Sequence, residues 1–128
     1  NFAIRKDRLE ELRPCLEKIV PVIQQAQIDY IADPTQANAL IISTVKTYDS
    51  WWSQSEGDVA NGASSQKDLG IVGNGETETF GDLEDARVND FIAKATPILR
   101  EQGLEIADIT AGDITDNSFL DTSITYKG

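Results

Sequence analysis

The side chains that could carry chemistry in this chain are mainly carboxylates. The 128 residues include 22 Asp and Glu against 11 Lys and Arg, with no histidine and one cysteine. Two carboxylates could support glycoside hydrolysis, but none lies in an apolar stretch that would raise its pKa. A nucleophilic Cys15 would need a histidine partner, so we expect a packed, inert thiol. The residue types therefore predict no catalytic residue, no metal site, no cofactor and no enzyme, with a carboxylate-dependent hydrolase as a remote alternative.

The glycine-rich residues 70–81 invite two ligand interpretations. A phosphate-binding loop would need a Lys-Ser/Thr pair or a Gly-x-Gly-x-x-Gly motif after a strand, and neither is present. Asn74, Glu76, Glu78 and Asp85 have the spacing of a calcium loop, but Thr79 stands where that loop needs glycine. We therefore expect a loop that binds neither ligand.

The adjacent Trp51 and Trp52 form the other conspicuous pair. Adjacent residues cannot share one helix face, so we expect one indole in the core and the other partly exposed. Paired aromatic side chains can line a pocket for a sugar or another organic ligand, and a structural anchor is the alternative. Of these two roles, we expect the structural anchor.

A mostly helical chain must position these residues. The longest predicted helix covers residues 13–34, whose apolar side chains recur at three- and four-residue steps: Leu16, Ile19, Val20, Ile23, Ala26 and Tyr30. Val22, Ile28 and Ile31 lie off this stripe, so we expect apolar cover on two sides of the helix. Pro14 suits its first turn, Pro21 predicts a kink, and Asp33-Pro34 predicts its end.

The other predicted elements are shorter. Residues 2–5 alternate like a strand, and residues 7–12 could form a short helix. A helix over residues 34–48 should pack antiparallel to the long helix, and another over residues 55–69 should begin at Ser55. A last helix over residues 82–102 should end at Gly103 and bury one stripe, namely Leu83, Ala86 or Arg87, Phe91, Ala95 and Ile98.

Charge and hydropathy limit the function further. The net charge is −11, with 6 basic and 7 acidic residues before position 55 and 5 basic and 15 acidic residues from there on. Such a surface repels phosphate backbones, so we expect no nucleic-acid binding. No apolar run approaches the 18 or so residues of a membrane span, and no signal peptide opens the chain. The opening reads as the middle of a longer protein.

Several short patterns, taken in order, resemble one family along essentially the whole chain. The first two are Phe-Ala-Ile-Arg-Lys-Asp-Arg-Leu at residues 2–9 and Ile-Ala-Asp-Pro-Thr-Gln-Ala at residues 31–37. The others are Pro14-Cys15-Leu16, the run from Val20-Pro21 to Gln27, Gly70-Ile71-Val72, Arg87-Val88, Gly103-Leu104 and Asp-Asn-Ser-Phe-Leu-Asp at residues 116–121. This order is similar to the C-terminal part of ABC-transporter solute-binding proteins of the type-II periplasmic-binding fold, in the nitrate/sulfonate and thiamine-precursor-like branch.

The resemblance implies that residues 1–128 are a single helical domain, the C-terminal fragment of a two-lobed α/β protein. It implies a receptor that captures a small organic or anionic solute and delivers it to an ABC permease in the membrane. The location would be periplasmic, or at the cell surface as a lipoprotein. The side chains nearest the cleft would be Arg5, Trp51, Trp52 and Asn74.

Two alternatives stay open. Arg5 could pair with an anionic solute, but we favour a structural ion pair with Asp7 or Glu10. The chain could also be a free-standing helical module whose acidic second half binds a basic partner. A piece cut from a larger core would expose apolar surface and self-associate as a dimer or a domain-swapped assembly.

Overall fold

The computed structural model describes residues 2–48 and 51–127. In this part of the chain every regular element is a helix, and loops and turns connect the helices. The elements are the 3-10 helix η1 (Lys6–Arg8) and the α-helices α1 (Leu9–Ala32), α2 (Thr35–Tyr48), α3 (Glu56–Asp68), α4 (Asp85–Glu101) and α5 (Ala111–Ile114). The predicted strand at residues 2–5 is not formed. Arg5 is locally extended, but a strand needs a neighbour to pair with, and no strand occurs among the described residues.

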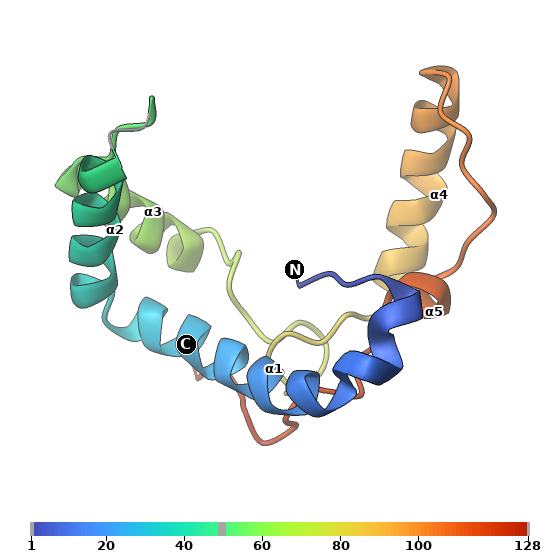
Figure 1. The fold of residues 1–128 in the computed structure, drawn as a ribbon, viewed down its shortest axis with the longest axis horizontal. Helices are drawn as coiled ribbons and strands as arrows, with labels where there is room; N and C mark the ends of the chain where they lie inside the picture. The colour runs from blue at the N-terminus through green and yellow to red at the C-terminus, as the bar shows by residue number, and fades with distance from the viewer. Residues whose placement is uncertain (1, 49–50, 128) are drawn as a thin grey trace.

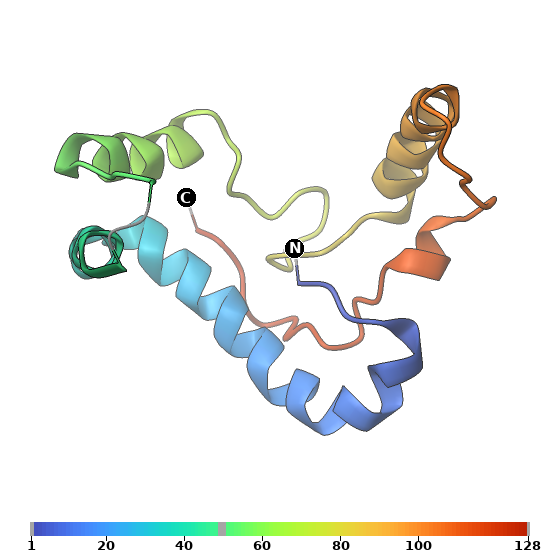
Figure 2. The ribbon, with the colours of Figure 1, turned by 45° about the horizontal axis from the view of Figure 1, so that its top comes forward.

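The helices form an open U, with α1 as its base (Figures 1 and 2). One arm is made of α2 and α3, and α3 packs against both α1 and α2. The other arm is α4, which packs against α5. The predicted antiparallel pairing of α1 with α2 is wrong, because α2 stands across the end of α1 (Figure 1). Asp33 has extended backbone angles at this corner, as expected for a residue before proline.

Helix α1 begins earlier than the sequence pattern predicted. The predicted short helix over residues 7–12 is continuous with it, so Pro14 lies inside the helix instead of in its first turn. Pro21 also lies inside, as predicted. Each proline removes one backbone hydrogen bond, and α1 is visibly bent between its two ends (Figure 2).

The inward face of α1 differs from the predicted stripe. Its two buried side chains are Leu16 and Gln24, and Val20 and Ile28 on the same side are half-buried. Ile19 and Ile23, predicted to face inward, are among the exposed large apolar residues of the chain. Gln24 is 4% exposed, and a buried amide of this kind is stable only where its polar atoms are hydrogen-bonded.

The helix ends follow their predicted signals more closely. Ser55 begins α3 with a reciprocal capping box, in which Ser55 Oγ accepts from Asp58 N and Asp58 Oδ2 accepts from Ser55 N. Gly70 follows the end of α3, and Gly103 follows α4 with φ of 84°. Leu104 N donates to the Leu99 carbonyl, which completes a glycine-based C-terminal cap of α4.

The core is small for a chain of this size. Seven apolar side chains of the described residues are buried: Leu16, Val59, Ala63, Val72, Phe80, Ala111 and Phe119. The total accessible surface is 9627 Å², whereas a compact protein of 14.0 kDa exposes about 6,700 Å². The excess of about 2,900 Å² reflects the open U, whose two arms do not pack against each other through their helices.

Candidate functional site

The best-organised polar site is the place where α1, the 70–81 loop and the C-terminal tail meet. The Gln24 side chain lies at its centre. Its Nε2 donates to the carbonyl oxygen of Phe80 at 2.7 Å, and its Oε1 accepts from the backbone N–H of Asp121 at 2.9 Å. The backbone N–H of Phe80 in turn donates to the Ile124 carbonyl at 2.9 Å. One buried amide thus ties two irregular segments to the base of the U, and we call this arrangement the Gln24 junction.

Asn74 makes a second link between the same loop and tail. Its Oδ1 accepts from the backbone N–H of Tyr126 at 2.7 Å, and its Nδ2 donates to the Tyr126 carbonyl at 2.8 Å and to Thr125 Oγ1 at 3.0 Å. The side-chain amide therefore pairs with the backbone as a neighbouring strand would. Phe80 and Tyr126 pack beside it, with ring centroids 6.4 Å apart.

The other predicted site residues lie apart from this junction or have partners of their own. Arg5 forms a two-pronged ion pair with Asp7, with N–O distances of 2.9 and 2.6 Å, which is the structural pairing considered as its alternative. Trp51 is 98% exposed, and Trp52 is exposed as well. The expectation that one indole would be buried is therefore wrong. The segment that carries them lies at the outer end of the α2–α3 arm, away from the 70–81 loop (Figure 1).

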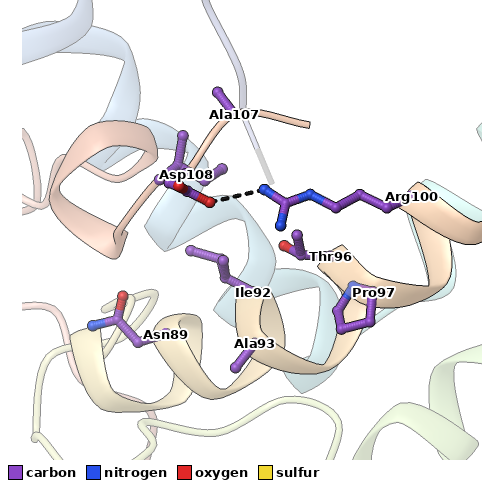
Figure 3. Close-up of a pocket in the computed structure, with 9 residues that line it drawn as sticks. Asn89, Ile92, Ala93, Thr96, Pro97, Arg100, Ala107 and Asp108 are labelled. Carbon is purple, nitrogen blue, oxygen red and sulfur yellow. Dashed lines mark hydrogen bonds and ion pairs between the residues drawn. The ribbon is translucent and has the colours of Figure 1, made fainter. Parts of the chain in front are cut away.

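A shallow groove of about 370 Å³ runs between α4 and the strap of residues 107–109 (Figure 3). Arg100 reaches across it, donating from Nη2 to Asp108 Oδ1 at 2.8 Å and to the Ile106 carbonyl at 2.7 Å. The guanidinium thus holds the strap against α4. Asn89 acts similarly at the other end, where its Oδ1 accepts from the N–H of Ala111 at 2.8 Å. Both contacts anchor the chain after α4 to that helix.

The pattern analysis missed Gln24 and Arg100. Gln24 lies in an apolar stretch of α1, and the one available signal was its place one turn after Val20 and one turn before Ile28. Arg100 carried only the general tendency of cations to lie near a helix C-terminus. Cys15 is also placed differently from the prediction, because it is exposed. Helix α1 turns Leu16 inward and leaves its neighbour on the surface.

Each carboxyl group with a shifted pKa has a pKa below its ordinary value. The pKa values of Asp58 and Asp113 are held below their ordinary values by hydrogen bonds from the backbone N–H and then the hydroxyl of Ser55 and Thr110, respectively. The pKa of Glu10 is lowered by its hydrogen bond and ion pair with Arg13. Each group is thus stabilised as an anion, whereas a general acid needs a raised pKa.

The described residues include neither a cluster of metal ligands nor a membrane-spanning helix. Over residues 2–48 and 51–127, no three or more histidine, cysteine or acidic side chains gather so that they could hold a metal ion. In the same part of the chain, no helix combines the length and the apolar character needed to cross a membrane.

Comparisons with known proteins add no relative. No family model, no curated protein and no solved structure matches this chain.

Proposed function

We propose that this chain is the helical C-terminal part of a solute-binding protein of an ABC importer. The observation that carries the proposal is the second apolar face of α1. The chain covers one side of this helix at the Gln24 junction, while Ile19, Val22 and Ile23 stay exposed, Val22 to 64%. A helix that is apolar on two sides belongs between two layers of protein. Among the described residues, only one such layer is present.

The size of the exposed surface supports the same proposal. An excess of about 2,900 Å² is much larger than the 800 Å² or so that one partner contributes to a standard interface. The exposed large apolar side chains occur on both arms and on the base of the U. A larger α/β body, of the kind implied by the sequence resemblance, would cover several of these faces at once.

In this proposal the chain contributes no catalysis. It forms part of a receptor that captures a small organic or anionic solute and hands it to a permease, on the outer side of the membrane. Arg5, Trp51, Trp52 and Asn74 stay the proposed solute contacts. For Arg5 and Asn74 this requires that a solute replace or extend contacts that these residues already make with Asp7 and Tyr126.

Solute binding by the whole gene product tests the proposal. We expect its melting temperature to rise with one or more members of a panel of nitrate, sulfonates, pyrimidines and other small organic anions, because a ligand that binds only the folded state stabilises it. The free 128-residue chain is the matched control and should not respond. A gene product that responds to no solute in the panel, and whose mass equals that of this chain, would contradict the proposal.

A helical interaction module is the second candidate, and the charge distribution favours it. Residues 55–128 carry 15 acidic and 5 basic residues, and the exposed acidic side chains include Glu56 and Asp58 at the start of α3. Such a surface attracts basic partners at low ionic strength. Capture of a basic protein that is lost on adding salt, with no response to solutes, would favour this module over the receptor.

A further inference from the structure

The Asn74–Gly75 pair in the 70–81 loop has the residue types of a spontaneous deamidation site. An asparagine loses its side-chain nitrogen as ammonia when the backbone nitrogen of the next residue attacks the amide carbon. Glycine is the most permissive next residue, because it has no Cβ to obstruct that attack. The chain contains two Asn-Gly pairs, Asn61–Gly62 and Asn74–Gly75, and the structure distinguishes them.

The two pairs differ in whether the attacking nitrogen is available. Asn61 and Gly62 lie within α3, where the Gly62 N–H is committed to a helical hydrogen bond and the backbone is held in one conformation. Gly75 lies in an irregular loop with φ of 68°, and its N–H has no hydrogen-bond partner among the described residues. The backbone therefore favours the reaction at Asn74 over Asn61.

The C-terminal tail controls access to the Asn74 amide, because the tail binds the group that must be attacked. Asn74 Nδ2 donates to the Tyr126 carbonyl at 2.8 Å and to Thr125 Oγ1 at 3.0 Å, and Asn74 Oδ1 accepts from the Tyr126 N–H at 2.7 Å. Residues 122–127 have no helix or strand structure, and segments of this kind open locally at low free energy. The amide can turn toward the Gly75 nitrogen only while these contacts are open, so opening of the tail limits the rate.

We propose that Asn74 is a deamidation site and that its conversion releases residues 125–127 from the 70–81 loop. The Gly75 nitrogen bonds to Asn74 Cγ, the Cγ–Nδ2 bond breaks, and the proton of the Gly75 N–H leaves with Nδ2 as ammonia. Water then adds to either carbonyl of the cyclic imide, and the C–N bond at that carbonyl breaks to leave aspartate or isoaspartate. Water is the only co-reactant, and the inference does not depend on the solute-binding role.

The product of this reaction cannot remake the contacts of Asn74. A carboxylate only accepts hydrogen bonds, so the oxygen that replaces Nδ2 faces the Tyr126 carbonyl oxygen with no proton between them. The Thr125 hydroxyl can turn to donate, but the carbonyl cannot, and an unpaired acceptor pair is unfavourable. Isoaspartate also adds a methylene group to the backbone, which moves the side chain away from Tyr126. The conversion therefore acts as a one-way switch, because the released tail is not recaptured.

Peptide mass spectrometry of the 128-residue chain, incubated at mildly alkaline pH, tests the site. Asn74 should convert faster than Asn61, and unfolding the chain in urea should remove the difference. Thr125→Val removes one contact that protects the Asn74 amide and should speed its conversion about fivefold. Thr122→Val is the matched control, because Thr122 is exposed in the same tail and is not one of the two residues that the Asn74 side chain binds. This variant should convert at the rate of the unchanged chain.

Asn74→Asp tests the release of the tail without waiting for the reaction. The backbone N–H of Tyr126 should exchange with solvent about tenfold faster in this variant, because the contact that protects it is weakened. Asn61→Asp is the control and should leave this exchange unchanged, and circular dichroism confirms that each variant folds. Equal conversion of Asn74 and Asn61 in the folded chain would overturn the proposal. So would equal rates in the two threonine variants, or unchanged exchange at Tyr126 in Asn74→Asp.

Discussion

At the scale of single residues, two side-chain amides provide pairing that a strand would provide in a sheet protein. Gln24 binds the backbone of the 70–81 loop and of the tail at once, and Asn74 joins these two segments directly. The loop and the tail have few regular hydrogen bonds of their own. Their position on α1 therefore depends on a small number of named contacts.

Replacing Gln24 tests this dependence. Gln24→Leu keeps most of the side-chain volume but leaves the Phe80 carbonyl and the Asp121 N–H without their buried partner. We expect a loss of about 2 kcal/mol in the free energy of unfolding, because buried polar groups without partners are costly. Urea denaturation followed by circular dichroism measures this loss.

Gln25→Leu is the control, because Gln25 is exposed and its Nε2 reaches only Asp29. This variant should change stability little. Equal effects of the two substitutions would show that the Gln24 junction is not formed in solution.

Sequence reasoning selected Asn74 but not Gln24. Asn74 was selected as a solute contact because it lies in the glycine-rich loop, which the family resemblance places near the cleft. Gln24 has the same side-chain amide group but lies within an apolar helix. A glutamine in such a helix is normally predicted to face the solvent. The partners that decide its burial lie 56 and 97 residues further along the chain. No local pattern contains that information.

At the scale of helices, the sequence predicts where a helix ends better than which of its faces is buried. Ser55, Gly70 and Gly103 fix helix ends through their own backbone and side-chain chemistry, and all three act as predicted. The predicted apolar stripes of α1 and α4 are correct only in part. In α1, Leu16 and Val20 face inward as predicted, but Ile19 and Ile23 are exposed. In α4, Ala95 is half-buried, but Phe91 and Ile98 are exposed. Each helix has apolar residues on two sides, and periodicity cannot tell which side the rest of the chain will cover.

The helix caps predict how stability depends on pH. Asp58 and Asp113 have lowered pKa values in the folded chain, through hydrogen bonds from the backbone N–H and the hydroxyl of Ser55 and Thr110. A carboxyl with a lowered pKa stabilises the fold above its unfolded pKa of about 4. That contribution is lost as the pH falls through the folded pKa. We therefore expect the melting temperature to fall as the pH is lowered below about 4.

Ser55→Ala gives a sharper form of the test. Without the hydroxyl, the pKa of Asp58 should move up toward its ordinary value, and α3 should lose stability above about pH 4. Carboxyl chemical shifts in an NMR titration report the pKa directly. Ser53→Ala, two residues earlier and outside the capping box, should have no effect. An unchanged Asp58 titration in Ser55→Ala would contradict the capping geometry.

At the scale of the whole molecule, the U has a small core and a larger accessible surface than a compact protein of the same mass. The described residues include seven buried apolar side chains, and the accessible surface is 9627 Å². This area is about 2,900 Å² larger than that of a compact chain of the same mass. The sequence predicted two-sided cover for α1 from Val22, Ile28 and Ile31. The structure places Ile28 inward and leaves Val22 outside. The second layer proposed for the outer face of α1 could not be predicted in detail, because none of the described residues forms it.

The intact mass of the product that the gene encodes tests the central proposal most directly. Mass spectrometry of that product should give a value several times the 14.0 kDa of this chain, since the outer face of α1 needs a second layer of protein. The additional sequence should alternate strands and helices, as the two lobes of a solute-binding protein require. A product of 14.0 kDa would contradict the receptor proposal, because the described residues form a shallow groove along α4 but enclose no solute cleft.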